Sequence, residues 1–204
     1  MNKISYLVLL MGFFAAATAQ ASQAELNKLR STVDAALDAL YGECCADLPK
    51  EEKRVKVRSI LEKNYDLSVI IRRAIGRNWS ELNESQQEQV LDLVKQLIVK
   101  AYVDGMKDQT RPEVEFGEVI EITDKRMEIP STVDLGDKQV NVLYRLGRLK
   151  SGWQIYDVVA EDISVVSNYR QQIDDHFRKG DAEGLITKLK ELLTKDEIDE
   201  DIAI

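Results

Sequence analysis

The chain has 204 residues, of which 44% are hydrophobic and 31% are charged, so it is long and apolar enough for one or two folded domains. It carries 28 Lys and Arg against 36 Asp and Glu, and no stretch concentrates basic residues, so nucleic acid is not an expected partner. One histidine and two adjacent cysteines are too few ligands for a zinc site, and we expect no metal and no cofactor.

The first 21 residues are typical of a secretory signal peptide. Lys3 supplies a positive charge, an apolar stretch runs from Ile4 to Ala17, and Ala19-Gln20-Ala21 forms a small-residue cleavage site. The apolar stretch is shorter than the ~20 residues that a spanning helix needs. We therefore predict cleavage after Ala21 and a mature single domain over residues 22–204, with an acidic tail from about residue 195.

Apolar residues spaced three and four apart predict helices in the first half of the mature chain. One covers residues 23–46 and a second follows Pro49. A third begins after Asp66 as N-cap and stops at Gly76. A fourth opens at residues 83–86, which resemble a capping box, and continues to Met106. Helical spacing returns after residue 164 and again after residue 180.

Between these helices the apolar period changes to two, which predicts strands over residues 113–123, 126–135, 138–149 and 152–162. The breaks are short enough for hairpins, so the four strands should form an antiparallel meander. Helices packed around this sheet give the α+β class. The third and fourth strands are apolar on both sides. Either helices cover both faces, or one face looks into an internal space.

The residues give little support for catalysis. The sequence has no nucleophile elbow, phosphate loop or dinucleotide fingerprint. His176 follows two aspartates at a predicted helix end, which favours a solvated residue over a catalytic base. Asp157, in an apolar strand, is the one acid worth following, although a structural pair with a nearby Arg is favoured. Cys44 and Cys45 are neighbours, where a disulfide would be strained, so we expect free thiols or an intermolecular bridge.

Three segments together resemble the MlaC family, also described as toluene-tolerance auxiliary proteins. The first contains Tyr65-Asp66-Leu67 and Ile75-Gly76-Arg77-Asn78-Trp79, followed by a long helix with Ala101-Tyr102. The second is Gly152-Trp153-Gln154-Ile155-Tyr156-Asp157-Val158. The third runs from Ser164 to Arg170 and into a Gly-Asp-x-x-Gly-Leu-Ile helix at 180–186. The resemblance spans residues 26–193.

The resemblance implies a non-enzymatic periplasmic carrier that binds phospholipid. Family members exchange the lipid with an inner-membrane ABC transporter that carries MCE-domain subunits and with an outer-membrane lipoprotein–porin complex, which maintains outer-membrane lipid asymmetry. Helices and a curved sheet enclose a hydrophobic pocket for the acyl chains and leave the head group in solvent. About thirty chain methylenes lose ~0.8 kcal/mol each on leaving the bilayer. We therefore expect a pocket at or above the upper end of the ~300–1,000 Å³ usual for ligand sites.

The resemblance also points to residues that would line this pocket. Tyr102 occupies the tyrosine of the family's long-helix motif, and Val140 and Val142 lie on its third strand. The remaining candidates are apolar or aromatic residues of the same helices and strands: Leu97, Ile98, Tyr144, Trp153, Tyr156, Val158, Ile71 and Ile75. For each of them ordinary core packing is the competing interpretation. Arg170 is expected to fix a helix against the sheet near a carboxylate such as Asp157.

Three alternatives stay open. The cargo is another amphiphile, such as a hopanoid precursor, because related proteins occur with those pathways. The protein is a small α+β hydrolase or isomerase that uses Asp157. Or it is an exported interaction module with a filled, dry core. Lipid that co-purifies without turnover would separate the carriers from the other two.

Overall fold

The computed structural model describes residues 5–45, 47–105 and 110–195, with side chains from Gln20 onward. Its helices and strands are, in chain order, α1 (Ser5–Tyr41), α2 (Lys50–Asn64), α3 (Leu67–Ile75), α4 (Glu84–Gly105), β1 (Glu113–Phe116), β2 (Ile120–Thr123), β3 (Arg126–Asp134), β4 (Gln139–Leu149), β5 (Gly152–Ala160), β6 (Ile163–Ser164), α5 (Val165–Phe177) and α6 (Ala182–Thr194). Short 3₁₀ helices, η1 (Glu43–Cys45) and η2 (Gly76–Glu81), follow α1 and α3. The predicted α+β class is confirmed.

Each predicted helix has a counterpart, and the largest difference is at the start of the chain. α1 begins at Ser5 and continues without a break through Ala21 to Tyr41. The predicted cleavage point therefore lies inside a helix of this structure, and cleavage stays a prediction. Residues 1–4, Met106 and the acidic tail beyond Lys195 lie outside the described residues. No helix in the described part of the chain combines the length and hydropathy that a membrane span requires.

Local polar side chains set the helix boundaries as predicted. The Asp66 carboxylate accepts from the Ser68 backbone N–H at 2.9 Å at the start of α3. Gly76 ends the same helix with a φ of 60°, a left-handed conformation that favours glycine. At α4, the Asn83 side chain accepts from the Gln86 N–H and the Gln86 side chain accepts from the Asn83 N–H, both at 3.0 Å. This is the reciprocal pattern of a capping box.

Replacing Asn83 by Ala should lower the free energy of unfolding by about 1 kcal/mol, because the Gln86 N–H loses its acceptor. Chemical denaturation of Asn83→Ala and Asn83→Ser measures this effect. Ser keeps a side-chain acceptor and should retain most of the stability. Equal losses in both variants would contradict the capping interpretation.

The sheet is an antiparallel meander in the order β1-β3-β4-β5-β6, with β2 also paired to β3. The prediction of four strands is wrong, because the first predicted strand is two strands and β6 follows the last one. Residues 113–116 pair with 134–131 in a constant register, whereas Ile120 pairs with Glu128, one position out of that register. The extra residue lies in the segment that connects β1 to β2, residues 117–119. A Cβ at Gly117 would lie 3.0 Å from Pro130, so the chain bends where glycine allows a close approach.

β5 also contains an irregularity. Arg145 pairs with Asp157 but Leu146 pairs with Ile155, which leaves Tyr156 as an extra residue. The bulge changes the alternation expected for this strand. Val158, paired with Tyr144, therefore joins the face of Ile155, while Val159 moves to the opposite face.

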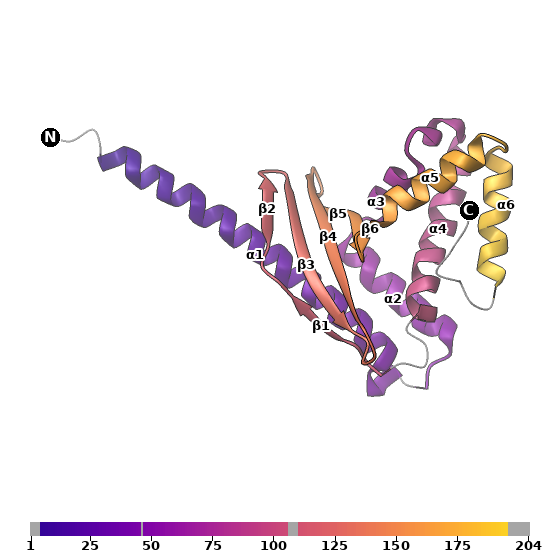
Figure 1. Cartoon of the computed structure of the whole chain (residues 1–204), viewed down its shortest axis with the longest axis horizontal. Helices are drawn as coiled ribbons and strands as arrows, with labels where there is room; N and C mark the ends of the chain where they lie inside the picture. The colour runs from indigo at the N-terminus through magenta and orange to yellow at the C-terminus, as the bar shows by residue number, and fades with distance from the viewer. Residues whose placement is uncertain (1–4, 46, 106–109, 196–204) are drawn as a thin grey trace.

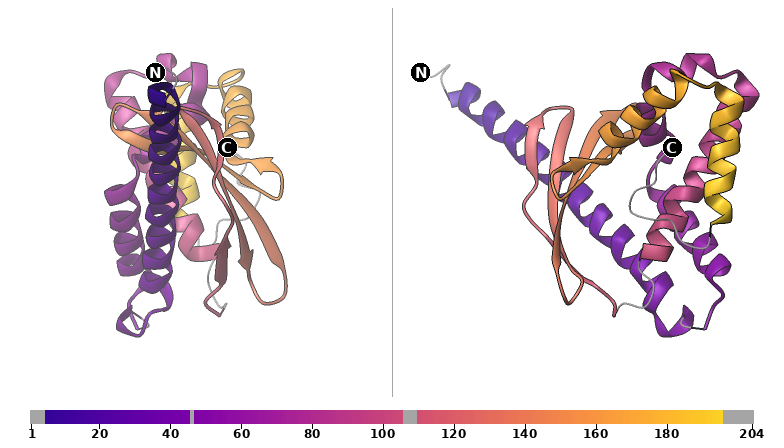
Figure 2. Two further views of the ribbon diagram at one scale, coloured as in Figure 1. Left: turned by 90° about the vertical axis from the view of Figure 1, so that its left-hand side faces the viewer. Right: turned by 45° about the vertical axis from the view of Figure 1, so that its right-hand side comes forward.

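α1 crosses the sheet, and its N-terminal half extends past β2, while α3 to α6 gather on the side of β5 and β6 (Figures 1 and 2). Three clusters of buried apolar side chains hold this arrangement together. The largest joins α3, α4, α5 and α6 and includes Ile71, Ile75 and Leu97. The second joins α1 to the sheet through Leu29 and Ile129. The third joins α1, α2 and α4.

Candidate functional site

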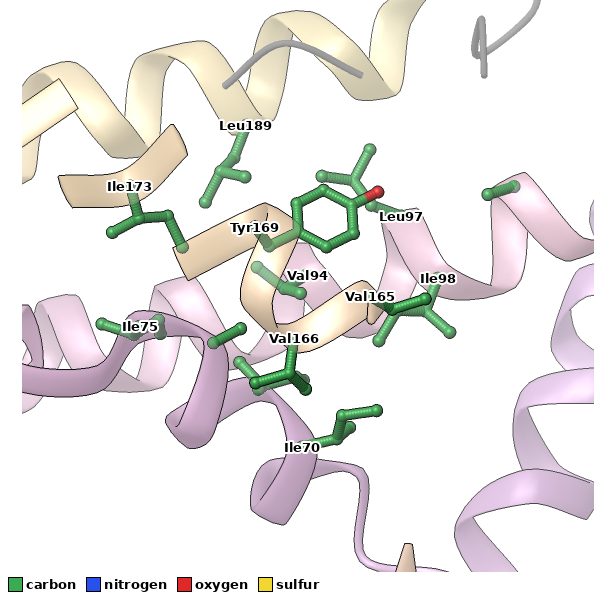
Figure 3. A pocket seen from close by; sticks show the side chains of 13 residues that line it. Ile70, Ile75, Val94, Leu97, Ile98, Val165, Val166, Tyr169, Ile173 and Leu189 are labelled. Carbon is green, nitrogen blue, oxygen red and sulfur yellow. The ribbon is translucent and has the colours of Figure 1, made fainter. Parts of the chain in front are cut away.

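An apolar cavity of about 80 Å³ lies where α3, α4 and α5 converge, with α6 closing one side (Figure 3). Apart from the hydroxyl of Tyr169, the lining side chains are hydrocarbon: Ile70, Ile71, Ala74, Ile75, Val94, Leu97, Ile98, Ala101, Val165, Val166, Tyr169, Ile173 and Leu189. Burial raises the pKa of Tyr169, so its phenol stays neutral at physiological pH. A site of this composition accepts hydrocarbon, and the neutral phenol of Tyr169 is the one titratable group among its lining residues.

The walls follow from helical spacing. Residues 70, 71, 74 and 75 form one face of α3, and residues 94, 97, 98 and 101 form one face of α4. The α5 wall starts at Val165, directly after its N-cap Ser164, whose hydroxyl accepts from the Ser167 N–H at 3.1 Å. The strand-to-helix junction therefore fixes how far Val165 and Val166 reach into the cavity.

The cavity is smaller than the pocket that the sequence predicts. A water molecule occupies about 30 Å³ of liquid volume, so 80 Å³ accommodates two or three groups of that size. Acyl chains with tens of methylenes need several times more space. A ligand of that kind enters this site only when the surrounding helices move apart or their side chains repack.

Four of the eleven predicted lining residues meet at this cavity: Ile71, Ile75, Leu97 and Ile98. The α5 residues of the wall were missed as site candidates, although their helical spacing is readable in the sequence. Periodicity identifies the apolar face of a helix but not which other helices share the same space. The pairing of α5 with α3 is a tertiary contact that a single sequence does not reveal.

Tyr102 extends the α4 face of the cavity toward the sheet. It follows Ala101 directly and lies one turn beyond Ile98, both of which line the cavity. Burial raises the pKa of Tyr102, and the nearby Tyr144 contributes to the shift. Burial also raises the pKa of Tyr144 to about 12.

All of the predicted strand residues except Tyr156 share one face of the sheet. Val140, Val142, Tyr144 and Val158 share one face of the sheet, because Tyr144 pairs with Val158 and Val142 with Ala160. Trp153 lies on the same face, because it pairs with Arg148, and both Trp153 and Tyr144 pack against the cluster that joins α1 to the sheet. Tyr156, the bulge residue, lies under the Arg73 guanidinium at 4.6 Å from its ring centroid. Trp153 and Tyr156 thus have packing partners of their own, away from the cavity in Figure 3.

Asp157 has a structural set of contacts. It is 5% exposed, and its carboxylate accepts from Ser164 Oγ at 2.8 Å, from Arg145 Nη1 at 3.2 Å and from the buried Val166 N–H at 3.2 Å. Through these hydrogen bonds the carboxylate links β5 to β4 and to the start of α5. This agrees with the favoured interpretation of a buried carboxylate paired with an Arg.

Asp157→Ala should lower the free energy of unfolding by about 2–4 kcal/mol, because it leaves the buried Val166 N–H without an acceptor and removes one partner of Arg145. Thermal or chemical denaturation measures the loss. Asp137→Ala, at an exposed turn position, is the matched control and should stay within about 0.5 kcal/mol of the parent. A stability equal to the control would contradict the structural role.

The expectation that Arg170 lies beside a carboxylate is wrong. Its Nε donates to the Arg73 backbone carbonyl at 3.0 Å, and Nη2 donates to the same oxygen. Arg170 therefore binds the C-terminal end of α3, where carbonyls lack helical partners. The side chain packs beside Gly76, where an added Cβ would lie 3.2 Å from Nε.

The remaining polar residues singled out in the sequence occupy structural positions. His176 Nε2 lies 2.9 Å from the Asp181 carbonyl at the corner between α5 and α6. Gly180 and Gly184 approach its ring so closely that an added Cβ would lie 3.2–3.3 Å away. Cys44 and Cys45 form no disulfide within this structure, and the choice between free thiols and an intermolecular bridge stays a prediction. Within the described ranges, no group of three His, Cys, Asp or Glu side chains could hold a metal ion.

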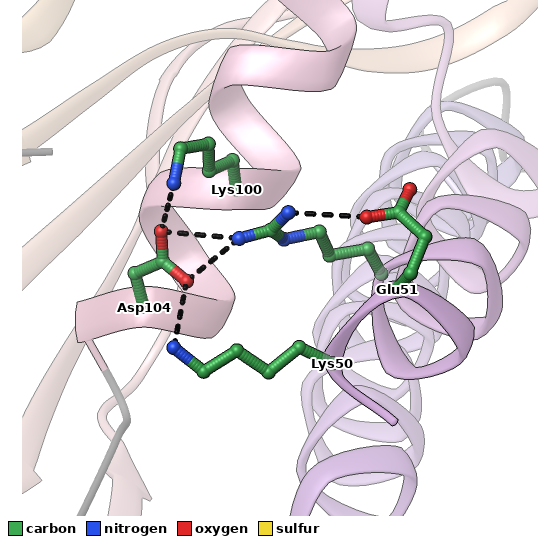
Figure 4. Close-up of polar contacts among 5 residues, drawn as sticks. Lys50, Glu51, Lys100 and Asp104 are labelled. Carbon is green, nitrogen blue, oxygen red and sulfur yellow. Dashed lines mark hydrogen bonds and ion pairs between the residues drawn. The ribbon is translucent and has the colours of Figure 1, made fainter. Parts of the chain in front are cut away.

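A charged network fixes α2 to α4 (Figure 4). The Asp104 carboxylate is 4% exposed and accepts from Lys100 at 2.6 Å and from Arg54 at 2.9 Å, with Lys50 at 3.8 Å. Arg54 also binds Glu51 at 3.1 Å. Lys100 belongs to the same helix as Asp104 and is equally buried, so the link between the two helices is the ion pair of Arg54 with Asp104, whose carboxylate is largely removed from solvent.

The fold and the cavity together define an α+β protein in which an apolar site lies among the helices that pack beside an antiparallel sheet. A family model described as "MlaC protein" matches residues 30–191. The chain belongs to the MlaC family, which confirms the resemblance read from the sequence.

One solved structure shares this fold over most of both chains. It is described as the phospholipid-binding protein from Ralstonia solanacearum in complex with a phospholipid. The two chains are 24% identical, the match covers 83% of this chain and 98% of the other, and the TM-score is 0.70. No curated protein matches the chain.

Proposed function

We propose that this protein is a periplasmic carrier that binds a phospholipid through its acyl chains. The observation that carries the proposal is the hydrocarbon cavity between α3, α4 and α5, in a fold shared with a protein solved in complex with a phospholipid. A cavity without charged side chains, in which a neutral phenol is the one titratable group of the lining, suits an apolar cargo better than a reaction. Membership of the MlaC family supports a binding and transport role over an enzymatic one.

The acyl chains would enter along the α4 face. That face leads from the cavity through Ala101 to Tyr102, whose neighbour Tyr144 lies on the sheet face of Val142 and Val140. The four helical candidates and this strand face would then form one continuous apolar wall. The cavity must expand for this, and each methylene transferred from a bilayer requires apolar contact worth ~0.8 kcal/mol.

The finer parts of the proposal rest on the family resemblance and on the predicted signal peptide. Export would place the mature chain in the periplasm. There it would exchange lipid between the outer-membrane lipoprotein–porin complex and the inner-membrane MCE-domain transporter, and so maintain outer-membrane lipid asymmetry. The energy for directed transport would come from the transporter, because this chain has no phosphate loop.

Asp157 bears on the enzymatic alternative. Its three contacts to Ser164, Arg145 and Val166 bind the carboxylate within the protein, and none of the cavity-lining residues is a second acid or base. Chemical identification of the bound molecule decides between a phospholipid and another amphiphile, such as a hopanoid precursor.

Native mass spectrometry of protein purified from periplasm without detergent tests the proposal, followed by organic extraction of the same sample. We expect a mass increment that extraction releases as intact phospholipid. Release of a different amphiphile would assign that cargo instead. A protein without cargo that also takes up no labelled phospholipid from vesicles would refute the carrier function.

A further inference from the structure

Two hairpin turns lie side by side at one end of the sheet (Figure 1). The β2–β3 turn contains Asp124 and Lys125, and the β4–β5 turn contains Lys150 and Ser151. Arg126 pairs with Gly147, and the backbone N–H of Arg148 in β4 donates to the Lys125 carbonyl at 2.9 Å. The two turns therefore form one continuous surface, which we call the hairpin end (residues 120–126 and 148–151).

The hairpin end exposes large apolar side chains. Ile120 is 47% exposed, Ile122 is 52% exposed and Leu149 is 48% exposed. Among the described residues, five large hydrophobic side chains are exposed to this degree, and three of them are here. Such side chains gain free energy when an apolar partner removes them from water.

The same surface is positively charged. Lys125, Arg126, Arg148 and Lys150 are all exposed, and none of the four forms an ion pair within the part of the chain that the structure describes. The acids of this surface are Asp124 and Glu121, and Glu121 accepts a hydrogen bond from Ser22. A cationic end on a chain with a formal charge of −8 orients the whole molecule toward an anionic surface.

We propose that the hairpin end binds the surface of an anionic lipid bilayer. Exposed apolar side chains flanked by Lys and Arg are the combination that holds proteins at the headgroup region of such membranes. A stable protein partner instead needs a packed patch of roughly 800 Å² per side, and two adjacent hairpin turns with three exposed apolar side chains do not form one. The contact goes beyond the proposed function, because a carrier that exchanges lipid only with protein complexes needs no membrane contact.

Co-sedimentation of the purified protein with vesicles tests the proposal. We expect binding to phosphatidylcholine vesicles that contain about one third phosphatidylglycerol, little binding to pure phosphatidylcholine, and a decrease at high salt. Lys125→Glu with Arg148→Glu should lower the partition coefficient at least about tenfold, since each cation near the surface contributes about fivefold. Ile122→Ser with Leu149→Ser should weaken the binding that remains at high salt.

Lys179→Glu with Lys190→Glu is the matched control, because it makes the same change in net charge at exposed positions elsewhere. We expect it to keep most of the binding. Equal losses in the two charge-reversed pairs, or no binding to anionic vesicles, would overturn the proposal, and capture of a protein by the hairpin end without vesicle binding would do so too. Circular dichroism confirms that each variant is folded. The bound-lipid content of the hairpin variants should be unchanged, which separates failure of this proposal from failure of the carrier function.

Discussion

Ala101→Trp should reduce the amount of phospholipid that co-purifies with the protein at least about tenfold, because the indole fills a cavity that has little free volume. Ala101 lies on α4 between the helical part of the cavity and Tyr102, so a large ring there blocks the proposed path of the acyl chains. Native mass spectrometry of the variant and the parent, prepared in parallel, measures the change.

The control for this variant is Ala24→Trp, an exposed position on α1, which should keep its lipid. Overpacking costs typically 1–3 kcal/mol, so thermal unfolding must show that Ala101→Trp is still folded. Ala74→Leu, a smaller addition on the α3 wall, should give a partial loss and guards against a folding defect in the Trp variant. A folded Ala101→Trp protein with the lipid content of the parent would place the acyl chains elsewhere.

The sequence predicts the elements of this fold better than their packing. Asp66, Gly76 and the pair Asn83 and Gln86 act over a few residues, so their effects are readable without tertiary information. The irregularities at Gly117 and Tyr156 are different, because each depends on pairing with the strand opposite. The division of the first predicted strand into β1 and β2 is a consequence of pairing with β3.

The candidate site shows the same limit. Helical spacing and the family resemblance together found four residues of the cavity, on α3 and α4. They did not find Val165 and Tyr169, because nothing in a single sequence says that α5 packs beside α3. The wrong partner expected for Arg170 has a related cause. A guanidinium can satisfy a helix C-terminus as well as a carboxylate, and only the fold brings Arg73 within its reach.

Asp104→Ala should lower the free energy of unfolding by about 3–5 kcal/mol, because it removes the buried carboxylate that Lys100 and Arg54 share. Urea denaturation at neutral pH measures the loss. Asp104→Leu combined with Lys100→Met removes both buried charges and should be less destabilising than Asp104→Ala alone. If the double variant loses more stability than Asp104→Ala, the attraction between the two charges exceeds the free-energy cost of burying them.

The pH dependence of the same pair has a defined sign. Burial by itself raises the pKa of Asp104, but hydrogen bonds and charge from Lys100 and Arg54 outweigh it and hold the pKa below its ordinary value. A carboxyl group whose pKa is lower in the folded state binds protons more readily when unfolded, so its contribution is present above about pH 4 and is lost as the pH falls through the folded-state pKa. The stability difference between the parent and Asp104→Asn should therefore be largest near neutral pH and shrink below about pH 4. A difference that stays constant across this range would mean that the charge of Asp104 does not hold α2 to α4.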